Sequence, residues 1–187
     1  MKKIIIGISG ASGAVLGVEM LKALKDMEDV ESHLVISDSA LETIDLETDY
    51  TQEEVLALAD RVYDFYDMAA DISSGSFKTE GMVIIPCSMK TLAGVACGYS
   101  ENLLLRAADV TLKEGRKLVV VPREAPLGRI HLKNMLELKE NGAVIIPPVM
   151  TFYNRLDSVE EMIDYLIGKI LDQFGIEYAG LKRWGEQ

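Results

Sequence analysis

The sequence predicts one α/β domain in which a doubly wound, mostly parallel sheet lies between two layers of helices. Short apolar runs rich in β-branched residues alternate with stretches of helical period, as expected for strands that are buried on both faces. The chain has 187 residues and is 49% apolar, enough for one sizeable core. Because no repeat, low-complexity stretch or long linker interrupts it, we expect residues 1–187 to form a single domain.

The elements follow in order from these patterns. An isoleucine run predicts a strand at residues 3–8, and the glycine-rich turn after it leads into a helix at 14–24. The next apolar run predicts a strand at 33–36, followed by helices at 39–45 and 51–59 and a marginal strand at 61–65. Three further runs predict strands at 82–86, 117–121 and 143–146, separated by helices at 91–97, 102–114 and 132–140. Strand and helix repeated in this way predict right-handed crossovers.

The final helix has the clearest signals. Apolar residues recur from Val159 to Phe174 at the spacing of one helix face. Ser158 with Glu161 forms a capping-box pattern at its start, and Gly175 suits a left-handed C-terminal cap. Residues 67–80, in contrast, show no period and are rich in serine, so we expect a mobile surface loop near the functional edge of the sheet.

Charge and cysteine usage exclude several classes. Thirty acidic and nineteen basic residues give a net charge of −11 without a basic stripe, so nucleic acids and membrane surfaces are poor partners. Gly7 interrupts the N-terminal isoleucines before a signal peptide or membrane span is complete, which favours a cytoplasmic protein. Two cysteines and two histidines match no zinc-ligand spacing, so we expect neither a metal site nor a disulfide framework.

The chemistry is expected where the strands end, because ligands of open parallel sheets bind outside the carboxyl ends of the strands. Small, hydroxyl-bearing and basic residues follow the predicted strands there: Ser9 to Gly13, Ser37-Asp38, Cys87 to Thr91, Arg123-Glu124 and Tyr153 to Arg155. The first of these loops enters a helix and could cradle a phosphate, although a tight glycine turn would give the same pattern. It matches neither G-x-G-x-x-G nor a nucleophile elbow, and two histidines leave a serine hydrolase as a weak alternative.

Other candidates have ordinary explanations from pattern alone. Arg106 and Lys113 would form surface ion pairs on one helix, and Lys169 would extend along its helix to solvent. Arg123-Glu124 directly follows a predicted strand and is therefore a candidate for binding substrate groups. We interpret Cys87 as a small buried residue rather than a nucleophile, and His131 as a packing or capping residue.

Taken together in order, these motifs resemble the UbiX-type flavin prenyltransferases, also described as aromatic-acid decarboxylase subunits. The resemblance covers almost the whole chain, and its motifs are specific as a set. They are Gly7-Ile8-Ser9-Gly10-Ala11-Ser12-Gly13, Glu47-Thr48-Asp49, Ser88-Met89-Lys90-Thr91, Asn102-Leu103-Leu104-Leu105-Arg106, Pro122-Arg123-Glu124-Ala125-Pro126, His131-Leu132-Lys133-Asn134-Met135, Pro147-Pro148 and the tail Arg183-Trp184-Gly185-Glu186-Gln187. The family implies a Rossmann-like or flavodoxin-like three-layer fold.

The resemblance also implies an activity. A dimethylallyl group would pass from its phosphate ester to reduced FMN, first at N5 and then by ring closure at C6, without a metal ion. The prenylated FMN would be delivered to a UbiD-type decarboxylase. The family assembles as a homododecamer with sites between subunits, so residues that do not face one another in one chain could still share a site.

Site roles carry over by motif. Glu124 would relay a proton, with Ser12 and Glu47 as helpers in positioning and proton transfer. Cations around the departing phosphate would stabilise its charge. The implied FMN ligands are Gly10, Ala11, Ser12, Ser37, Ser88, Met89, Lys90, Thr91 and Arg123, and the implied ligands of the prenyl phosphate are Arg106, Lys113, Tyr153 and Lys169.

The sequence departs from the family pattern at two places and leaves two other hypotheses open. Met89-Lys90 replaces smaller residues, and Lys169 replaces the usual arginine, which lysine cannot match in bidentate geometry. One alternative is an FMN carrier or a relative of the phosphopantothenoylcysteine decarboxylases, although residues 14–24 lack their histidine. The other, a dehydrogenase fragment that binds a ribose through Asp38, lacks both G-x-G-x-x-G and a substrate domain.

Overall fold

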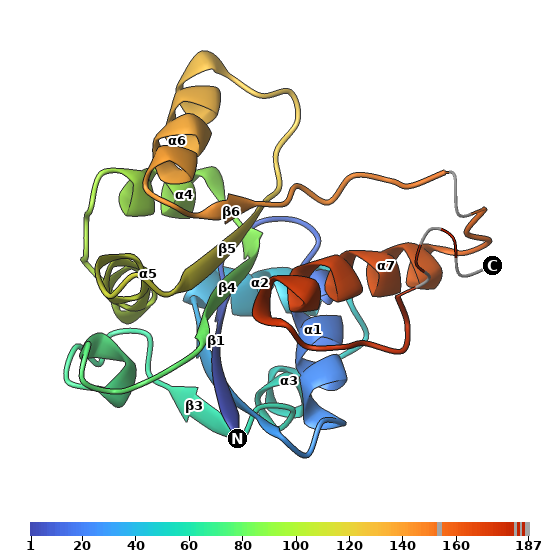
Figure 1. The fold of residues 1–187 in the computed structure, drawn as a ribbon, viewed down its shortest axis with the longest axis horizontal. Coiled ribbons are helices and arrows are strands. Elements are labelled where there is room, and N and C mark those ends of the chain that lie inside the picture. The colour runs from blue at the N-terminus through green and yellow to red at the C-terminus, as the bar shows by residue number, and fades with distance from the viewer. Residues whose placement is uncertain (153–154, 182, 184, 186–187) are drawn as a thin grey trace.

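The computed structural model of the chain describes residues 1–152, 155–181, 183 and 185. Six parallel strands form one sheet in the order β3-β2-β1-β4-β5-β6, with helices packed on both of its faces (Figure 1). The strands are β1 (Lys2–Ile8), β2 (Val30–Ile36), β3 (Arg61–Tyr63), β4 (Gly81–Cys87), β5 (Lys117–Pro122) and β6 (Val144–Ile145). The α-helices are α1 (Val15–Lys25), α2 (Asp38–Glu47), α3 (Gln52–Leu56), α4 (Met89–Ala96), α5 (Leu103–Lys113), α6 (Arg129–Glu140) and α7 (Val159–Leu171), with short 3-10 helices η1 (Asp71–Ser73) and η2 (Asp172–Phe174).

The doubly wound topology is confirmed. From β1 the chain proceeds through β2 to β3 on one side, then returns to β4 beside β1 and continues through β5 to β6 on the other side. The strand order therefore reverses between β1 and β4. Such a reversal opens a crevice between the loops at the carboxyl ends of these two strands.

Alternate residues of the strands face two separate cores. Ile4, Ile6 and Ile8 of β1 pack with α1, α2, α3 and α7, whereas Ile5 packs with α4, α5 and Leu138 of α6. Because side chains alternate between two covered faces, the central strands β1, β4 and β5 read as nearly continuous apolar runs. Among the described residues, no helix combines the length and apolar character needed to cross a membrane.

Residues 67–80 are placed differently from the expectation. They contain η1 and run along the α5 side of the sheet to the amino end of β4, with Ala70 and Ile72 buried in the core. Arg106 Nε donates to Ser73 O at 3.1 Å, and Arg116 donates to the carbonyls of Gly75 and Phe77. The expected position at the functional edge is wrong, because the segment runs towards the amino edge of the sheet, with two side chains buried and arginine contacts along it.

Candidate functional site

Ser9 joins the loops that follow the two central strands. Its side chain is buried, its Oγ donates to Pro86 O at 3.1 Å and accepts from Ser88 N at 2.8 Å. Sequence reasoning placed Ser9 in the first loop without assigning it a role. The serine acts as a bridge that holds the Gly10–Ser12 loop beside the start of α4.

Three helices begin at this edge of the sheet. Their N-terminal caps are Ser37 for α2, Ser88 for α4 and Asn102 for α5, and each side chain accepts a hydrogen bond from a backbone N–H three residues later. All three caps line one small pocket of about 70 Å³, together with Lys90 and Thr91. Three positive helix ends and a lysine around one small volume suit an anion.

Gly10 and Ser39 meet at the wall of this pocket. A Cβ atom at position 10 would lie 2.3 Å from Ser39 Oγ and 3.1 Å from the Ser39 carbonyl carbon, so only glycine allows the two loops to approach this closely. Ser39 Oγ is also 3.2 Å from Ser37 Oγ. Sequence reasoning missed Ser39 and Asn102; an asparagine before an apolar helix is a recognisable capping signal, whereas nothing in the sequence marks Ser39.

Glu47 is the last residue of α2, and its side chain contacts the backbone at the start of α1, beside the first loop. Its Oε2 accepts hydrogen bonds from Gly13 N at 2.7 Å and Ala14 N at 3.1 Å, and the Ser12 hydroxyl also bonds to the carboxylate. Burial by itself raises the pKa of Glu47, but the bonds from Ser12, Gly13 and Ala14 and the nearby Arg123 charge together lower it. The structure thus brings together Ser12, Glu47 and Arg123, which the sequence predicted separately.

This lowered pKa gives a pH-dependent contribution of Glu47 to stability. The ionised carboxylate favours the folded state above its ordinary pKa of about 4.5, and the contribution is lost as pH falls through the lower folded value. We expect Glu47→Gln to lose roughly 0.5–1 kcal/mol of unfolding free energy at pH 7, the lower part of the capping range because the side chain is exposed. Urea unfolding from pH 7 down to about 3 checks this. A difference that grew at low pH would contradict it.

Arg123 and Glu124 follow β5 at the same edge. Arg123 N donates to Cys87 O at 3.2 Å, which holds this turn against the end of β4, and both charged side chains are exposed within one chain. Glu124 Oε1 accepts from Ala125 N at 3.0 Å. The pair therefore stands beside the Ser12–Glu47 cluster with its side chains open to an incoming ligand.

Two of the predicted phosphate ligands lie at other parts of the chain, and a third is paired on its own helix. Lys113 ends α5 four residues before β5 begins, so it lies at the amino edge of the sheet, where it pairs with Glu114 at 2.6 Å. Lys169 is near the C-terminus of α7, close to η2, whose Phe174 carbonyl accepts from Lys2 at the start of β1. Arg106 pairs with Asp109 at 2.7 Å. Tyr153 lies outside the described residues.

Cys87 and His131 have the structural roles that the sequence predicts for them. Cys87 is completely buried, and burial raises the pKa of its thiol far above the usual range, which argues against a nucleophile. His131 Nδ1 accepts from Gly128 N at 3.1 Å at the start of α6, so it caps a helix. In the described part of the chain, no three His, Cys, Asp or Glu side chains are grouped as metal ligands.

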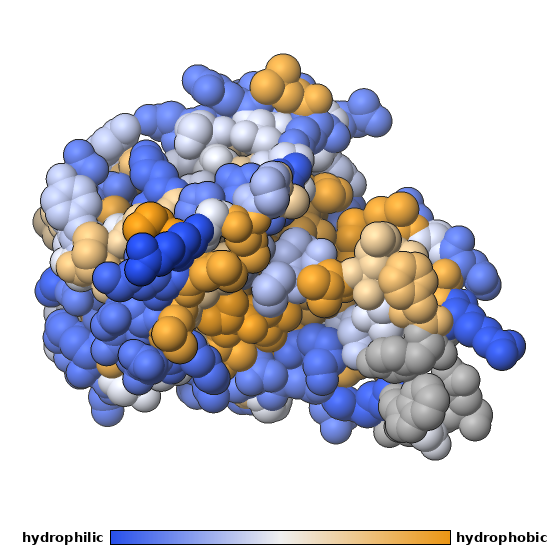
Figure 2. All heavy atoms as spheres, turned by 90° about the horizontal axis from the view of Figure 1, so that it is seen from above, coloured by the Kyte–Doolittle hydropathy of each residue, from blue (hydrophilic) through white to orange (hydrophobic). Residues whose placement is uncertain are grey.

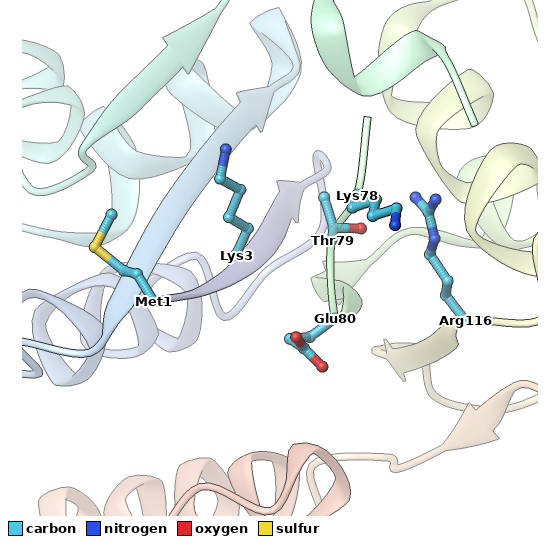
Figure 3. Close-up of a pocket in the computed structure, with 6 residues that line it drawn as sticks. All are labelled: Met1, Lys3, Lys78, Thr79, Glu80 and Arg116. Atoms are coloured by element: carbon cyan, nitrogen blue, oxygen red, sulfur yellow. The ribbon is translucent and has the colours of Figure 1, made fainter. Parts of the chain in front are cut away.

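A larger cavity lies at the opposite edge of the sheet. It measures about 590 Å³ and is lined by residues near the amino ends of β1, β4 and β5 (Figure 3). Two of its charged groups are already engaged: Lys3 lies over the Phe77 ring, and Arg116 donates to two carbonyls. Because the labelled side chains do not converge on one point and no helix longer than η1 begins there, the candidate site remains at the carboxyl edge.

Comparison with known proteins gives matches along most of the chain. A family model described as Flavoprotein matches residues 1–171. A probable UbiX-like flavin prenyltransferase of Sedimentibacter hydroxybenzoicus is 59% identical over 182 residues, 97% of this chain and 96% of that protein. The flavin prenyltransferase UbiX of Escherichia coli K12 is 54% identical over 176 residues, 94% of this chain and 93% of its own length.

Solved structures agree with these relatives. The crystal structure of a dodecameric FMN-dependent UbiX-like decarboxylase from Escherichia coli O157:H7 has a TM-score of 0.95 at 54% identity and covers 97% of this chain and 98% of its own. The crystal structure of AnUbiX (PadA1) in complex with FMN and dimethylallyl pyrophosphate has a TM-score of 0.96 at 49% identity, covering 100% of this chain and 98% of that one. The similarity therefore covers nearly the whole chain and is not confined to the loops at the ends of the strands.

Proposed function

The chain belongs to the family of UbiX-like flavin prenyltransferases, and from this premise we propose that it transfers a dimethylallyl group from a dimethylallyl phosphate to reduced FMN. The enzyme is a transferase and a flavoprotein. In the proposed reaction the allylic C–O bond breaks and the phosphate leaves with the electron pair, while N5 of the flavin bonds to the prenyl carbon and releases its proton. The prenyl double bond then takes up a proton, C6 bonds to the resulting carbocation, and C6 loses its own proton. A UbiD-type decarboxylase is the proposed recipient of the product.

The observation that carries this proposal is the pair of neighbouring sites at the carboxyl edge. The small pocket at the three helix N-termini fits a phosphate group in size and charge. The Ser12–Glu47–Arg123 cluster lies one loop away, joined to it through Gly10 and Ser9. We place the FMN phosphate in the pocket and the flavin ring towards the cluster. Bound reduced FMN then supplies the nucleophilic ring atoms.

The residues around the ring have distinct roles in this proposal. Glu124, exposed beside Arg123, accepts the proton that leaves C6 during ring closure and passes it to the departing phosphate. The Ser12 hydroxyl, fixed by its bond to Glu47, positions the reacting ring edge, and the low pKa of Glu47 keeps that carboxylate ionised as the acceptor. Arg123 adds a cation beside the reacting centre.

The remaining cations come from neighbouring subunits in our proposal. Within one chain Lys113 lies at the amino edge of the sheet, Lys169 lies near the end of α7 and Arg106 pairs with Asp109, so in our proposal an assembly like the dodecameric relative supplies these cations across interfaces. Figure 2 shows hydrophobic side chains gathered on one face of the molecule. Large apolar residues are exposed on and around α6 and beyond β6, which supports burial between copies: Leu127, Ile130, Leu132, Leu136, Val149, Met150 and Phe152.

The placement of the phosphate predicts a preference for FMN over riboflavin. Riboflavin lacks the phosphate and loses all contacts with the three helix ends, so we expect it to bind at least about 100-fold more weakly. Quenching of flavin fluorescence measures both affinities. Lys90→Gln should reduce the difference between the affinities for FMN and riboflavin. Lys133, an exposed lysine of α6 outside the pocket, provides the control, and Lys133→Gln should leave this difference unchanged. Equal binding of FMN and riboflavin would contradict the placement.

A further inference from the structure

Acidic side chains lie next to the small pocket in which we place the FMN phosphate, whereas the helix N-termini and Lys90 that line this pocket are positive. Glu101 lines the pocket, and two further acids are chain neighbours of lining residues, Asp38 next to Ser37 and Asp64 next to Phe65; we name these three residues the acidic rim. All three residues are exposed. Asp38 follows the capping Ser37 of α2, and Glu101 precedes the capping Asn102 of α5, so both acids stand directly beside the groups that attract the phosphate.

Tyr66 brings the acidic rim together. Its hydroxyl donates to Asp38 Oδ2 at 2.8 Å, and its backbone N–H donates to Asp64 Oδ1 at 2.7 Å. The hydrogen bond to Asp38 raises the pKa of Tyr66, and the charges of Asp64 and Glu101 raise it further. Tyr66 therefore contacts Asp38 and Asp64 directly, and Glu101 is the acid of the rim that lines the pocket itself.

The walls of the pocket are fixed by backbone hydrogen bonds. Leu103 N donates to Phe65 O at 2.9 Å, which ties the start of α5 to the chain after β3. Tyr99 N donates to Gly94 O at 2.9 Å, which closes the turn after α4. Phe65 and Tyr99 both line the pocket. With about 70 Å³ enclosed, the pocket takes part of a ligand, since pockets for whole ligands measure roughly 300–1,000 Å³.

We propose that the acidic rim selects flavin mononucleotide and rejects FAD. This inference rests on the proposed function, because it assumes that the flavin phosphate occupies the pocket. A single terminal phosphate ends inside the positive pocket. In FAD the same phosphate carries a second phosphate and an adenosine, which must leave the pocket past Glu101 and Asp38, where like charges repel it.

Glu101 is the rim residue best suited to a test. It lines the pocket, its side chain is exposed, and it caps no helix. The full-length protein is titrated with FMN and with FAD, and the measured quantity is the ratio of the two dissociation constants. We expect Glu101→Gln to improve FAD binding relative to FMN by about three- to tenfold, the effect of one partly screened charge, and Glu101→Lys to improve it further.

Glu28→Gln is the matched control, because it removes one exposed acid in the turn between α1 and β2 at the other end of the sheet. It should leave the ratio unchanged. A ratio that stays constant in both Glu101 variants, or that shifts equally in Glu28→Gln, overturns the inference while the proposed function stands. Failure of the wild-type protein to bind FMN overturns both. Added salt should reduce the discrimination in wild type more than in Glu101→Gln.

Discussion

Glu124→Gln is expected to lower the rate of flavin prenylation by about 10²–10⁴-fold, the range measured for loss of a general acid or base. Glutamine keeps the size of the side chain and its hydrogen-bond acceptor towards Ala125 N, but it cannot carry the proton from flavin to phosphate. FMN affinity should change less than about threefold, because Glu124 is absent from the phosphate pocket. Single-turnover assays with reduced FMN and fluorescence titrations separate the two quantities.

The control is Glu140→Gln, an exposed acid at the end of α6, which should retain wild-type rates. A near-wild-type rate in Glu124→Gln would remove Glu124 from the chemical step. Loss of FMN binding or of the folded state in this variant would instead assign it a structural role.

Lys169→Ala is expected to lower the rate by about 10²-fold or more, as for removal of one group that stabilises transition-state charge. Lys169→Arg should retain activity, because arginine keeps the cation and adds a bidentate fork for phosphate. FMN affinity should be unaffected in both variants. Full activity of Lys169→Ala would contradict the prediction that the exposed ammonium group of Lys169 binds the departing phosphate.

Mixed oligomers test whether Lys169 acts across a subunit interface. Glu124→Gln and Lys169→Ala chains are co-expressed with different tags and purified together. If one subunit supplies Lys169 to the site of another, about one quarter of the sites in a random mixture combine two wild-type residues and recover activity. If both residues serve the site of their own chain, the mixture stays as inactive as its parents.

The central strands β1, β4 and β5 could be predicted because each is an apolar run buried on both faces, whereas two element starts were predicted too late. β2 begins at Val30, three residues before its expected start. Ser32 there is buried because Asp60 Oδ2 accepts from both its N–H and its hydroxyl, at 2.7 and 2.9 Å. α6 begins at Arg129 instead of 132, where the His131 ring caps a polar first turn. Such partners are distant in sequence or specific to one turn, so periodicity does not show them.

The candidate site was predictable only in part. Strand ends located the loops, and the structure brings Ser12, Glu47 and Arg123 together as the topology implies. Ser39 could not be found, since its place depends on the close approach of Gly10. The roles of Arg106, Lys113 and Lys169 came from resemblance alone and remain predictions, because within one chain Lys113 and Lys169 lie near the far ends of their helices and Arg106 pairs with Asp109.

The most direct test of prenyl transfer is the mass of the flavin product. The purified protein is incubated anaerobically with reduced FMN and either dimethylallyl monophosphate or dimethylallyl diphosphate. The molecular mass of the extracted flavin is then measured by mass spectrometry. We predict the gain of one five-carbon prenyl unit with at least one donor. Unmodified flavin with both donors, from protein that binds FMN, would contradict prenyl transfer and favour a flavin carrier or a decarboxylase relative.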